Sequence, residues 1–338
     1  MGTSKNIIVC TSSDAVGGIA RVNNYLQDLL TQKDINTTVV SYKISSSKLL
    51  QKALFWQKLQ LSLQSGSKII FTHMHLAGVL KAITGRYPYM VLVHGLEIKL
   101  DEHSDYQEIL SEADELVVNS KKTKNDIQKH YGIDNVTHCY YPPAKFDKSN
   151  IDCKKMERPT ILLVGRMEAA ERYKGHDELI EIWPDVKEKI PDARLVFVGT
   201  GNDAPRLQQK VEKLGLSNDI LFKKNVSDKE LAEYYAKSWA FCMPSSGEGQ
   251  GLVYSEAMQF GLPVIALKNS PAAELIDDRK SGILVEQNDA ESLNKAIVQI
   301  LSDDKMRKKM SENAKKRYEK FYRENTFDET IMNFVGAD

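Results

Sequence analysis

The chain has 338 residues, enough for two domains that each bury a core, and its composition is that of an ordinary globular protein. Its 46 Lys and Arg residues balance 46 Asp and Glu residues, so no net charge favours a nucleic-acid partner. Four widely spaced cysteines without a C-x-x-C pair argue against a disulfide framework or a zinc site. The sequence has no run of eighteen apolar residues and no signal-peptide core, so we expect a cytoplasmic protein.

Apolar runs of strand length alternate with amphipathic helical stretches throughout the first half of the chain. Six strands are expected there, at residues 7–10, 37–42, 68–72, 89–94, 115–119 and 136–140. Continuous apolar strands separated by helices are typical of a parallel sheet that is covered on both faces. The pattern predicts a Rossmann-like domain over residues 1–145.

The same alternation returns in the second half, with strands expected at residues 160–165, 194–199, 220–223, 240–243, 263–267 and 282–285. The polar, proline-bearing stretch 140–159 is typical of a linker. We therefore predict an α/β protein with two doubly wound, Rossmann-like domains, the second over residues 146–320. Because ligands of open parallel sheets bind at the carboxyl ends of the strands, the two domains should face each other across a cleft.

Among the motifs, residues 247–263, GEGQGLVYSEAMQFGLP, carry the most specific chemistry. Seven residues separate Glu248 from Glu256, and the glycine-bearing turn between them leads into a helix pattern. This spacing suits a loop-to-helix transition with both carboxylates at the mouth of one site, where the free N–H groups of residues 249–253 would favour a phosphate. Carboxylates beside a phosphate indicate hydroxyl binding, and therefore a sugar phosphate or a nucleotide sugar.

A second motif, VGRMEAAERYKGHDEL at residues 164–179, places Arg166 and Lys174 around a loop after a predicted strand. Two cations at the carboxyl end of a strand can neutralise a diphosphate leaving group without a metal. The alternative is that both are solvated surface cations. The chain contains no D-x-D pair, so no ligands for a metal-bridged diphosphate are visible.

Two further motifs fall in the predicted first domain. Gly17 and Gly18 follow the first strand and open a helix, either to let a ligand approach the backbone or simply to form a tight turn. His94 ends the strand at 89–94, where it can donate to a sugar hydroxyl or a phosphate, although a lone histidine is more often structural. His73 and His75 stand at another strand end and allow the same two interpretations.

The segment FVGTGNDA at residues 197–204 matches the G-x-G-x-x-A dinucleotide pattern. A NAD site also requires an acidic residue at the end of the next strand, and Lys223 and Lys224 stand there instead. A dehydrogenase is therefore the weakest alternative.

The stretch 45–63 combines apolar and basic residues at helical spacing. It predicts either an interfacial amphipathic helix or a core-packing helix with a basic rim. The residues concerned are Leu49, Leu50, Phe55, Trp56, Leu59, Lys48, Lys52 and Lys58.

Together these motifs resemble the GT-B glycosyltransferases of family 4, over nearly the whole chain. The glycine loop, the G-R-…-K-G segment and the E-x7-E segment occur in that family's order and spacing. RYKGHDELIEIWP resembles the bacterial branch that builds polysaccharides and O-antigens on lipid carriers. Two positions depart from the family, Gln250 where Phe is common and Lys224 where Gly is common.

The resemblance implies a retaining, metal-independent hexosyltransferase with four catalytic residues. Arg166 and Lys174 would hold the diphosphate as it leaves, Glu248 would grip the donor sugar, and His94 would approach the transferred sugar. The residues expected to bind substrate are Gly17, Gly18, Arg166, Lys174, Glu248, Gly249, Gln250, Gly251, Leu252 and Glu256, with Glu256 on the ribose.

The resemblance also implies the substrates. The donor would be a nucleotide sugar, with UDP favoured over GDP, and no cofactor would be needed. The acceptor would be a glycan on polyprenyl diphosphate, which would bring the protein to the cytoplasmic face of the inner membrane. The last segment, 321–338, would form a helix that crosses back to the first domain. A nucleotide-sugar epimerase of the same architecture and a non-catalytic glycan- or nucleotide-sugar-binding protein remain as alternatives.

Overall fold

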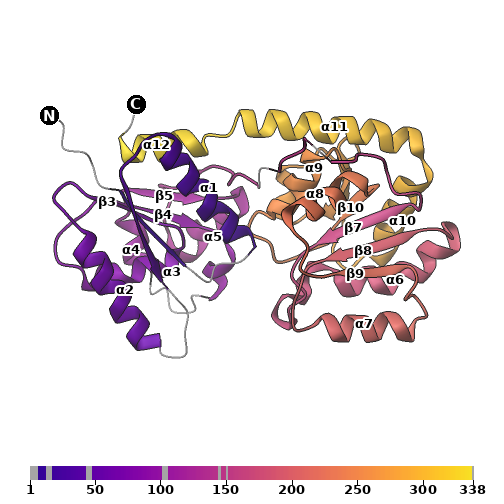
Figure 1. The fold of residues 1–338 in the computed structure, drawn as a ribbon, viewed down its shortest axis with the longest axis horizontal. Coiled ribbons are helices and arrows are strands. Elements are labelled where there is room, and N and C mark those ends of the chain that lie inside the picture. The colour runs from indigo at the N-terminus through magenta and orange to yellow at the C-terminus, as the bar shows by residue number, and fades with distance from the viewer. Residues whose placement is uncertain are drawn as a thin grey trace. The chain divides into compact units, whose positions relative to one another are not determined.

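The structure, a computed structural model, describes residues 7–12, 17–42, 48–100, 106–143, 146–149 and 151–336. It divides into two units, one comprising Met1–Pro143 with Asn325–Asp338 and the other comprising Ala144–Glu324. The boundaries expected from the sequence, after residues 145 and 320, differ from these by two and four residues. Each unit contains one six-stranded parallel sheet (Figure 1).

The N-terminal unit has the strand order β2-β1-β3-β4-β5-β6. Its strands are β1 (Ile7–Ser12), β2 (Thr37–Tyr42), β3 (Lys68–Phe71), β4 (Tyr89–Val93), β5 (Glu115–Val118) and β6 (Thr137–His138). Its helices are α1 (Gly18–Gln32), α2 (Lys48–Ser62), α3 (Met74–Ala77), α4 (Gln107–Ser111), α5 (Lys121–Tyr131) and α12 (Phe327–Val335), with the 3₁₀ turns η1 (Gly78–Ala82) and η2 (Leu96–Leu100).

Strand β1 illustrates why this sheet is covered on both faces. Ile7, Ile8, Val9 and Cys10 are all fully buried. Ile8 and Cys10 belong to the core that the sheet forms with α2, α3, α4 and α5. Because side chains alternate along a strand, Ile7 and Val9 face the other side, where α1 and α12 pack together through an edge-to-face ring pair.

Helix α12 is the last described element and packs in the N-terminal unit. Phe327 is fully buried, and the Tyr25 hydroxyl of α1 donates to the Asp328 carboxylate at 2.9 Å. The Lys68 ammonium group also donates to the carbonyl oxygen of Phe334. The end of the chain therefore completes the core of the unit that the chain begins.

The C-terminal unit has the strand order β12-β11-β10-β7-β8-β9. Its strands are β7 (Thr160–Val164), β8 (Arg194–Val198), β9 (Ile220–Lys223), β10 (Ala240–Cys242), β11 (Val264–Leu267) and β12 (Gly282–Val285). Its helices are α6 (His176–Lys189), α7 (Ala204–Lys213), α8 (Asp228–Lys237), α9 (Leu252–Gln259), α10 (Ala290–Ser302) and α11 (Asp304–Arg323), with the 3₁₀ turns η3 (Ala169–Lys174) and η4 (Pro271–Glu274).

The helices of this unit form two groups on opposite faces of its sheet (Figure 1). Helix α6 contacts both α7 and α10, whereas α11 lies along α9. Local sequence supports these elements: α8, for example, begins with a capping box in which Ser227 and Glu230 bond each other's backbone N–H groups. None of the helices in the described part of the chain is long and apolar enough to span a bilayer.

All twelve strands predicted from the sequence are present in the described residues. The prediction for residues 136–140 was too long, because β6 contains only Thr137 and His138. This strand lies at the edge of its sheet, where only β5 pairs with it, so fewer ladder hydrogen bonds extend it.

Candidate functional site

The strand order of the C-terminal sheet reverses between β7 and β10. Strands β8 and β9 continue on one side of this pair, and β11 and β12 continue on the other. In open parallel sheets, ligands bind beside the carboxyl ends of the strands at such a switch point. The loops that follow β7 and β10 carry Arg166, Lys174 and Glu248, so the fold brings these three predicted residues to one edge.

An ion pair joins the two loops. The Lys174 Nζ atom lies 2.6 Å from Glu248 Oε1, and both side chains are only 12% exposed. Ser245 Oγ donates to the same carboxylate oxygen at 3.2 Å. A pair at this degree of burial is screened less by solvent and salt than an exposed pair, so its charges act strongly on a nearby ligand.

Arg166 and a carboxylate that the sequence analysis missed complete this group. The Arg166 guanidinium pairs with Glu171, whose other oxygen lies 3.7 Å from Lys174 Nζ. The two cations are thus balanced by Glu171 and Glu248. Glu171 stands three residues before Lys174 in η3, and a Glu in such a polar turn is usually a solvated surface residue. No sequence signal distinguished it.

Glycines allow the two loops to approach each other. Gly175 has φ +90°, and a Cβ atom there would lie 2.5 Å from Pro244 Cγ. The backbone N–H of Ser246 donates to the Tyr173 carbonyl at 3.0 Å, and a Cβ at Gly247 would lie 2.6 Å from the Tyr173 ring. Only glycine at both positions lets the loop with Lys174 pack directly on the loop with Glu248.

The predicted binding residues Gly249, Gln250, Gly251 and Leu252 lie at the N-terminal end of α9. Gly251 is the cap residue, at φ +73°, and as a glycine it has no side chain to cap the helix. The Gln250 side chain donates to the Tyr322 hydroxyl of α11 at 3.2 Å. Helix α9 therefore presents its N-terminus at the carboxyl edge of β10, where its dipole favours an anion.

Glu256 differs from the expectation that both glutamates lie at the mouth of a site. It lies within α9 and is only 1% exposed, and its Oε2 atom accepts a hydrogen bond from the Tyr235 hydroxyl at 2.9 Å. The reason is that α9 is packed between α8 and α11, where Gln259 also bonds to Tyr318. The role of Glu256 in ribose binding stays a prediction.

The glycines of the G-x-G turn are explained by packing between loops. A Cβ at Gly199 would lie 2.0 Å from the carbonyl oxygen of Gly165, and one at Gly201 would lie 2.1 Å from that of Met167. The Met167 N–H also donates to the Thr200 carbonyl at 2.8 Å. This turn therefore supports the loop that carries Arg166.

Ion pairs also connect the loop that carries Arg166 to the segment that follows the G-x-G turn. Arg172 donates twice to Asp203, at 3.0 and 2.9 Å, and Arg206 donates to Asp203 and to Asp177. Hydrogen bonds from Arg206, followed by those from Arg172, hold the pKa of Asp203 well below its usual range. The carboxylate thus stays ionised at neutral pH and keeps η3 attached to the start of α7.

In the N-terminal unit, His94 follows β4 and is held from three directions. Its Nε2 atom lies 2.8 Å from the Thr72 carbonyl oxygen, its backbone N–H donates to Glu97 at 2.6 Å, and Asn119 donates to its carbonyl at 3.0 Å. A carbonyl only accepts, so Nε2 carries the proton of this bond. The role of His94 at a sugar hydroxyl or a phosphate stays a prediction.

His73 and His75 lie beside His94. The His73 ring stacks on the His94 ring with 5.7 Å between centroids, and the His75 ring is 4.9 Å from that of His73. Burial lowers the pKa of His73 to about 4, against an opposing effect of Glu97. His73 is therefore neutral at physiological pH. Within the described ranges, no group of His, Cys, Asp and Glu side chains is arranged to hold a metal.

Gly17 and Gly18 lie at the start of α1, after β1. Gly17 has φ +63° and caps the helix without a side-chain bond, and both residues are exposed. They share the carboxyl edge of their sheet with His94. These three predicted residues belong to the N-terminal unit and the others belong to the C-terminal unit, so the structure groups the predicted residues into two sets.

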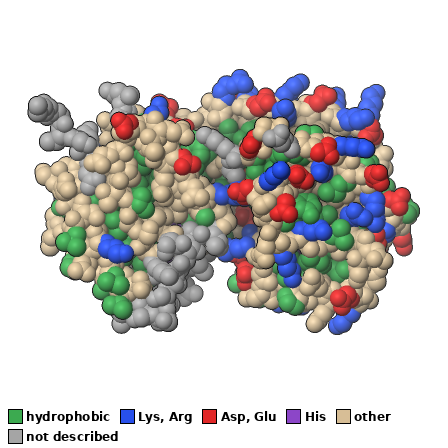
Figure 2. Space-filling model, viewed as in Figure 1, with side chains coloured by type: hydrophobic (Ala, Val, Ile, Leu, Met, Phe, Trp, Pro, Cys, Tyr) green, Lys and Arg blue, Asp and Glu red, His purple; other side chains and the backbone are tan. Residues whose placement is uncertain are grey.

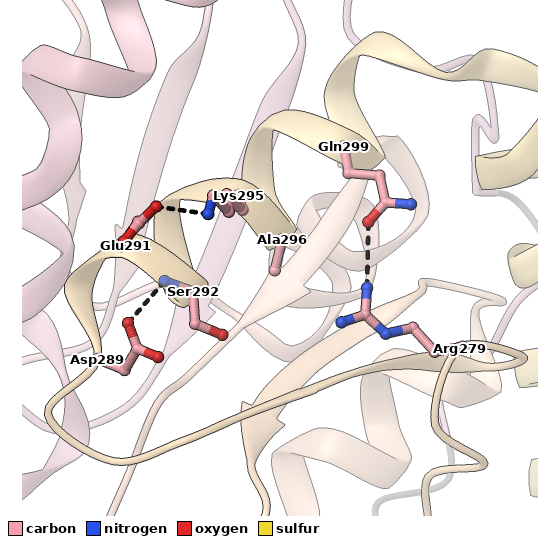
Figure 3. Close-up of a pocket in the computed structure, with 7 residues that line it drawn as sticks. All are labelled: Arg279, Asp289, Glu291, Ser292, Lys295, Ala296 and Gln299. Atoms are coloured by element: carbon pink, nitrogen blue, oxygen red, sulfur yellow. Dashed lines mark hydrogen bonds and ion pairs between the residues drawn. The ribbon is translucent and has the colours of Figure 1, made fainter.

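A pocket of about 230 Å³ lies elsewhere in the C-terminal unit, along α10 (Figure 3). None of the predicted site residues lines it. Its polar side chains bond to one another: Lys295 pairs with Glu291, and Arg279 donates to the Gln299 side chain at 3.2 Å. This pocket therefore offers a ligand few uncommitted charges, and the switch point remains the candidate site. The lining residues are Arg279, Asp289, Glu291, Ser292, Lys295, Ala296 and Gln299.

Known proteins resemble this chain in both sequence and fold. An uncharacterized glycosyltransferase of Haemophilus influenzae is 30% identical over 217 residues, which are 64% of this chain and 60% of that protein. A GDP-mannose-dependent alpha-(1-6)-phosphatidylinositol monomannoside mannosyltransferase of Mycolicibacterium smegmatis is 31% identical over 154 residues, 44% of this chain and 40% of that protein. The chain thus spans at most about 60% of the length of these two relatives.

The crystal structure of Anabaena HepE in complex with UDP and glucose superposes with a TM-score of 0.75 at 18% identity, over 98% of this chain and 99% of that chain. At this identity the likeness establishes the fold, which is GT-B as predicted. Residues 145–317, more than half of the chain, match the family model described as Glycosyl transferases group 1. The chain belongs to the group 1 glycosyl transferases.

Proposed function

We propose that this protein is a retaining glycosyltransferase of family 4 that moves a hexose or an N-acetylhexosamine from a nucleotide sugar to a glycan acceptor. The observation that carries the proposal is the cluster of Arg166, Lys174 and Glu248 at the switch point of the C-terminal sheet. It supplies two cations for a diphosphate and a carboxylate for sugar hydroxyls within one small volume. UDP is favoured over GDP, because HepE was solved with UDP, although the mycobacterial relative is named for GDP-mannose.

Each of these residues has a chemical task in the proposal. Arg166 and Lys174 neutralise the charge that develops on the leaving diphosphate, which makes a metal unnecessary. Glu248 accepts hydrogen bonds from hydroxyls of the donor sugar, and His94 approaches the transferred sugar. The acceptor hydroxyl attacks on the face from which the diphosphate leaves, so the anomeric configuration is retained. No covalent nucleophile is required.

The acceptor in the proposal is a growing oligosaccharide on polyprenyl diphosphate, as in the synthesis of O-antigen or another surface polysaccharide. Two observations support a lipid-linked acceptor. The mycobacterial relative is named for a phosphatidylinositol-linked acceptor. Helix α2 exposes leucines beside lysines, which favours contact with the cytoplasmic face of the inner membrane. Family membership speaks against the epimerase alternative.

The experiment that tests the proposal is a calorimetric titration with UDP and GDP, with EDTA present throughout. We expect saturable binding of one nucleotide. Lys174→Gln should weaken it tenfold or more, because a charge-assisted hydrogen bond contributes roughly 1.5–3 kcal/mol. Lys268→Gln is a matched control, since Lys268 also follows a strand of this sheet and pairs with a carboxylate, Glu286, at 2.7 Å. It should bind like the wild type.

A second step separates catalysis from binding. Product formation is measured with UDP- and GDP-sugars and a lipid-linked acceptor, and the anomeric configuration is read by NMR. Nucleotide binding without product, for every sugar and acceptor, would support the non-catalytic alternative. Binding that Lys174→Gln leaves unchanged would overturn the site assignment.

A further inference from the structure

Glu171 contacts both cations of the candidate site. Its Oε1 atom pairs with the Arg166 guanidinium, and its Oε2 atom lies 3.7 Å from Lys174 Nζ. The Glu171 side chain is 12% exposed, whereas that of Arg166 is 47% exposed. One carboxylate therefore faces both cations from the inner side of the loop, while Arg166 remains open to solvent.

This carboxylate is incompletely satisfied. Its Oε2 atom is buried, and it accepts no hydrogen bond from any residue in the described part of the chain. A buried charged oxygen without a hydrogen bond costs free energy, so native structures contain few of them. The backbone of Glu171, at φ −121° and ψ 28°, also interrupts the 3₁₀ turn η3. The chain thus keeps a carboxylate beside the two cations in an arrangement that is not optimal for an ion pair alone.

Lys174 has a similar arrangement with its second partner. Its ammonium group binds Glu248 at 2.6 Å, so both cations of the candidate site are neutralised by carboxylates of the same unit. A diphosphate that binds Arg166 and Lys174 has to displace these carboxylates or remain within a few ångströms of them. Like charges at that distance repel each other strongly.

We propose that Glu171 is an internal placeholder for the diphosphate of the donor: it holds Arg166 and Lys174 in the empty site and competes with the nucleotide for them. This inference rests on the proposed function. Binding of the donor exchanges Glu171 for phosphate oxygens, and Lys174 leaves Glu248 at the same step. Glu248 is then available to the hydroxyls of the sugar attached to that diphosphate. After transfer, Glu171 returns to the cations and helps to expel the nucleoside diphosphate.

The placeholder also makes the site selective among anions. Inorganic phosphate forms few contacts and gains little by displacing a carboxylate that is already in place. A nucleoside diphosphate adds contacts from its base, its ribose and its second phosphate, and these compensate for the exchange. Removing the Glu171 carboxylate should therefore strengthen the binding of both the nucleoside diphosphate and inorganic phosphate. The relative gain should be larger for phosphate, which cannot displace the carboxylate in the wild type.

The experiment measures the binding of UDP and of inorganic phosphate by calorimetry, and the release of UDP by stopped-flow displacement. Glu171→Gln keeps an oxygen that can accept from Arg166 but removes the charge, and Glu171→Ala removes both. In each variant we expect UDP to bind on the order of tenfold more tightly and to dissociate more slowly. Phosphate should bind measurably to the variants and not to the wild type. Circular dichroism confirms that both are folded.

Glu168→Gln is the matched control. Glu168 lies three residues earlier in the same loop, where its carboxylate accepts from the Asn202 N–H at 3.3 Å, a bond that glutamine keeps. This variant loses the same charge and should bind UDP within twofold of the wild type. Unchanged or weaker UDP binding in both Glu171 variants would overturn the placeholder. If the wild type fails to bind UDP, or Lys174→Gln has no effect on its binding, the proposed function itself fails.

Discussion

At the scale of single residues, the candidate site depends on positions that only glycine can occupy. Tyr173 and Lys174 end a turn that lies on the β10–α9 loop, and Gly175 is the residue at which the chain leaves that turn. Its positive φ angle and its contact with Pro244 both exclude a side chain. The reach of Lys174 toward Glu248 therefore depends on the glycine that follows it in the chain.

We predict that Gly175→Ala lowers the free energy of unfolding by about 2–4 kcal/mol. Roughly 1 kcal/mol comes from the left-handed backbone and the rest from the overlap with Pro244. Urea unfolding followed by circular dichroism measures the change. Gly215→Ala is the control, because Gly215 has φ +69° in the same unit but no atom within 4 Å of an added Cβ. Its free energy of unfolding should fall by only about 1 kcal/mol. Equal decreases in the two variants would show that the overlap with Pro244 contributes nothing.

At the scale of elements, α2 shows what an amphipathic pattern can and cannot predict. The helix was predicted over residues 45–63 and spans Lys48–Ser62. However, two of the residues assigned to its apolar side, Phe55 and Leu59, belong to the core of the unit. The exposed apolar residues lie elsewhere on the helix: Leu50, Leu54, Trp56 and Leu61. The side chains of Lys48 and Leu49 lie outside the described residues.

The exposed leucines of α2 form one stripe. Leu50, Leu54 and Leu61 are four and seven residues apart, which places them on one face, away from Phe55 and Leu59. Lys58 is exposed beside this stripe, four residues after Leu54, whereas Lys52 is exposed on the opposite side of the helix. Hydrophobic and basic side chains both appear over α2 in Figure 2. An exposed apolar stripe on a helix that also exposes lysines suits an interface with anionic lipid.

We predict that the double variant Leu50→Ser, Leu61→Ser binds vesicles of phosphatidylglycerol and phosphatidylethanolamine at least fivefold more weakly than the wild type. Removing two leucines from the lipid interface loses roughly 1–3 kcal/mol of apolar burial. Cosedimentation measures the bound fraction. Leu214→Ser is the control, since Leu214 is 45% exposed in the C-terminal unit. If it weakens binding as much as the double variant does, α2 is not the contact.

At the scale of the whole molecule, the periodicity of the sequence was enough to predict two parallel sheets. Strand β11, for example, ends where its apolar run ends at Leu267, because all four of its residues are buried and burial on both faces demands an uninterrupted run. Spacing also brought Arg166, Lys174 and Glu248 together, because the carboxyl ends of adjacent parallel strands lie at one edge. Periodicity carries no information about which side chains meet across loops.

Two residues mark that limit. Glu171 turns toward the cations because the 3₁₀ turn is interrupted at its own position, and no pattern in the sequence encodes that interruption. Glu256 is buried because α9 packs between α8, which ends 15 residues before α9 begins, and α11, which begins 45 residues after α9 ends. Both outcomes depend on tertiary contacts, so both required the structure.

The whole molecule should lose stability in mild acid, because each unit contains a buried neutral histidine. Burial lowers the pKa of His73 to about 4 in one unit, and burial followed by repulsion from Lys174 lowers that of His176 to about 4 in the other. In the unfolded chain each imidazole takes up a proton near pH 6.5. Between pH 6.5 and 4 the unfolded state therefore binds more protons, and the free energy of unfolding falls as the pH falls.

We predict that the midpoint of thermal unfolding, measured by calorimetry, is nearly constant from pH 8 to 7 and falls steadily from pH 6.5 to 4.5. Each histidine contributes up to about 1.4 kcal/mol per pH unit in that window. His176→Asn should reduce the slope for the C-terminal unit, since His176 is 3% exposed and its ring packs edge-on against Phe197. His73→Asn keeps an acceptor for the start of α3 and should reduce the slope for the N-terminal unit. Slopes that match the wild type in both variants would show that these two histidines do not cause the acid sensitivity. Ion pairs such as Asp177 with Arg206 do not explain a loss in this window, because the arginine lowers the pKa of Asp177 to about 2.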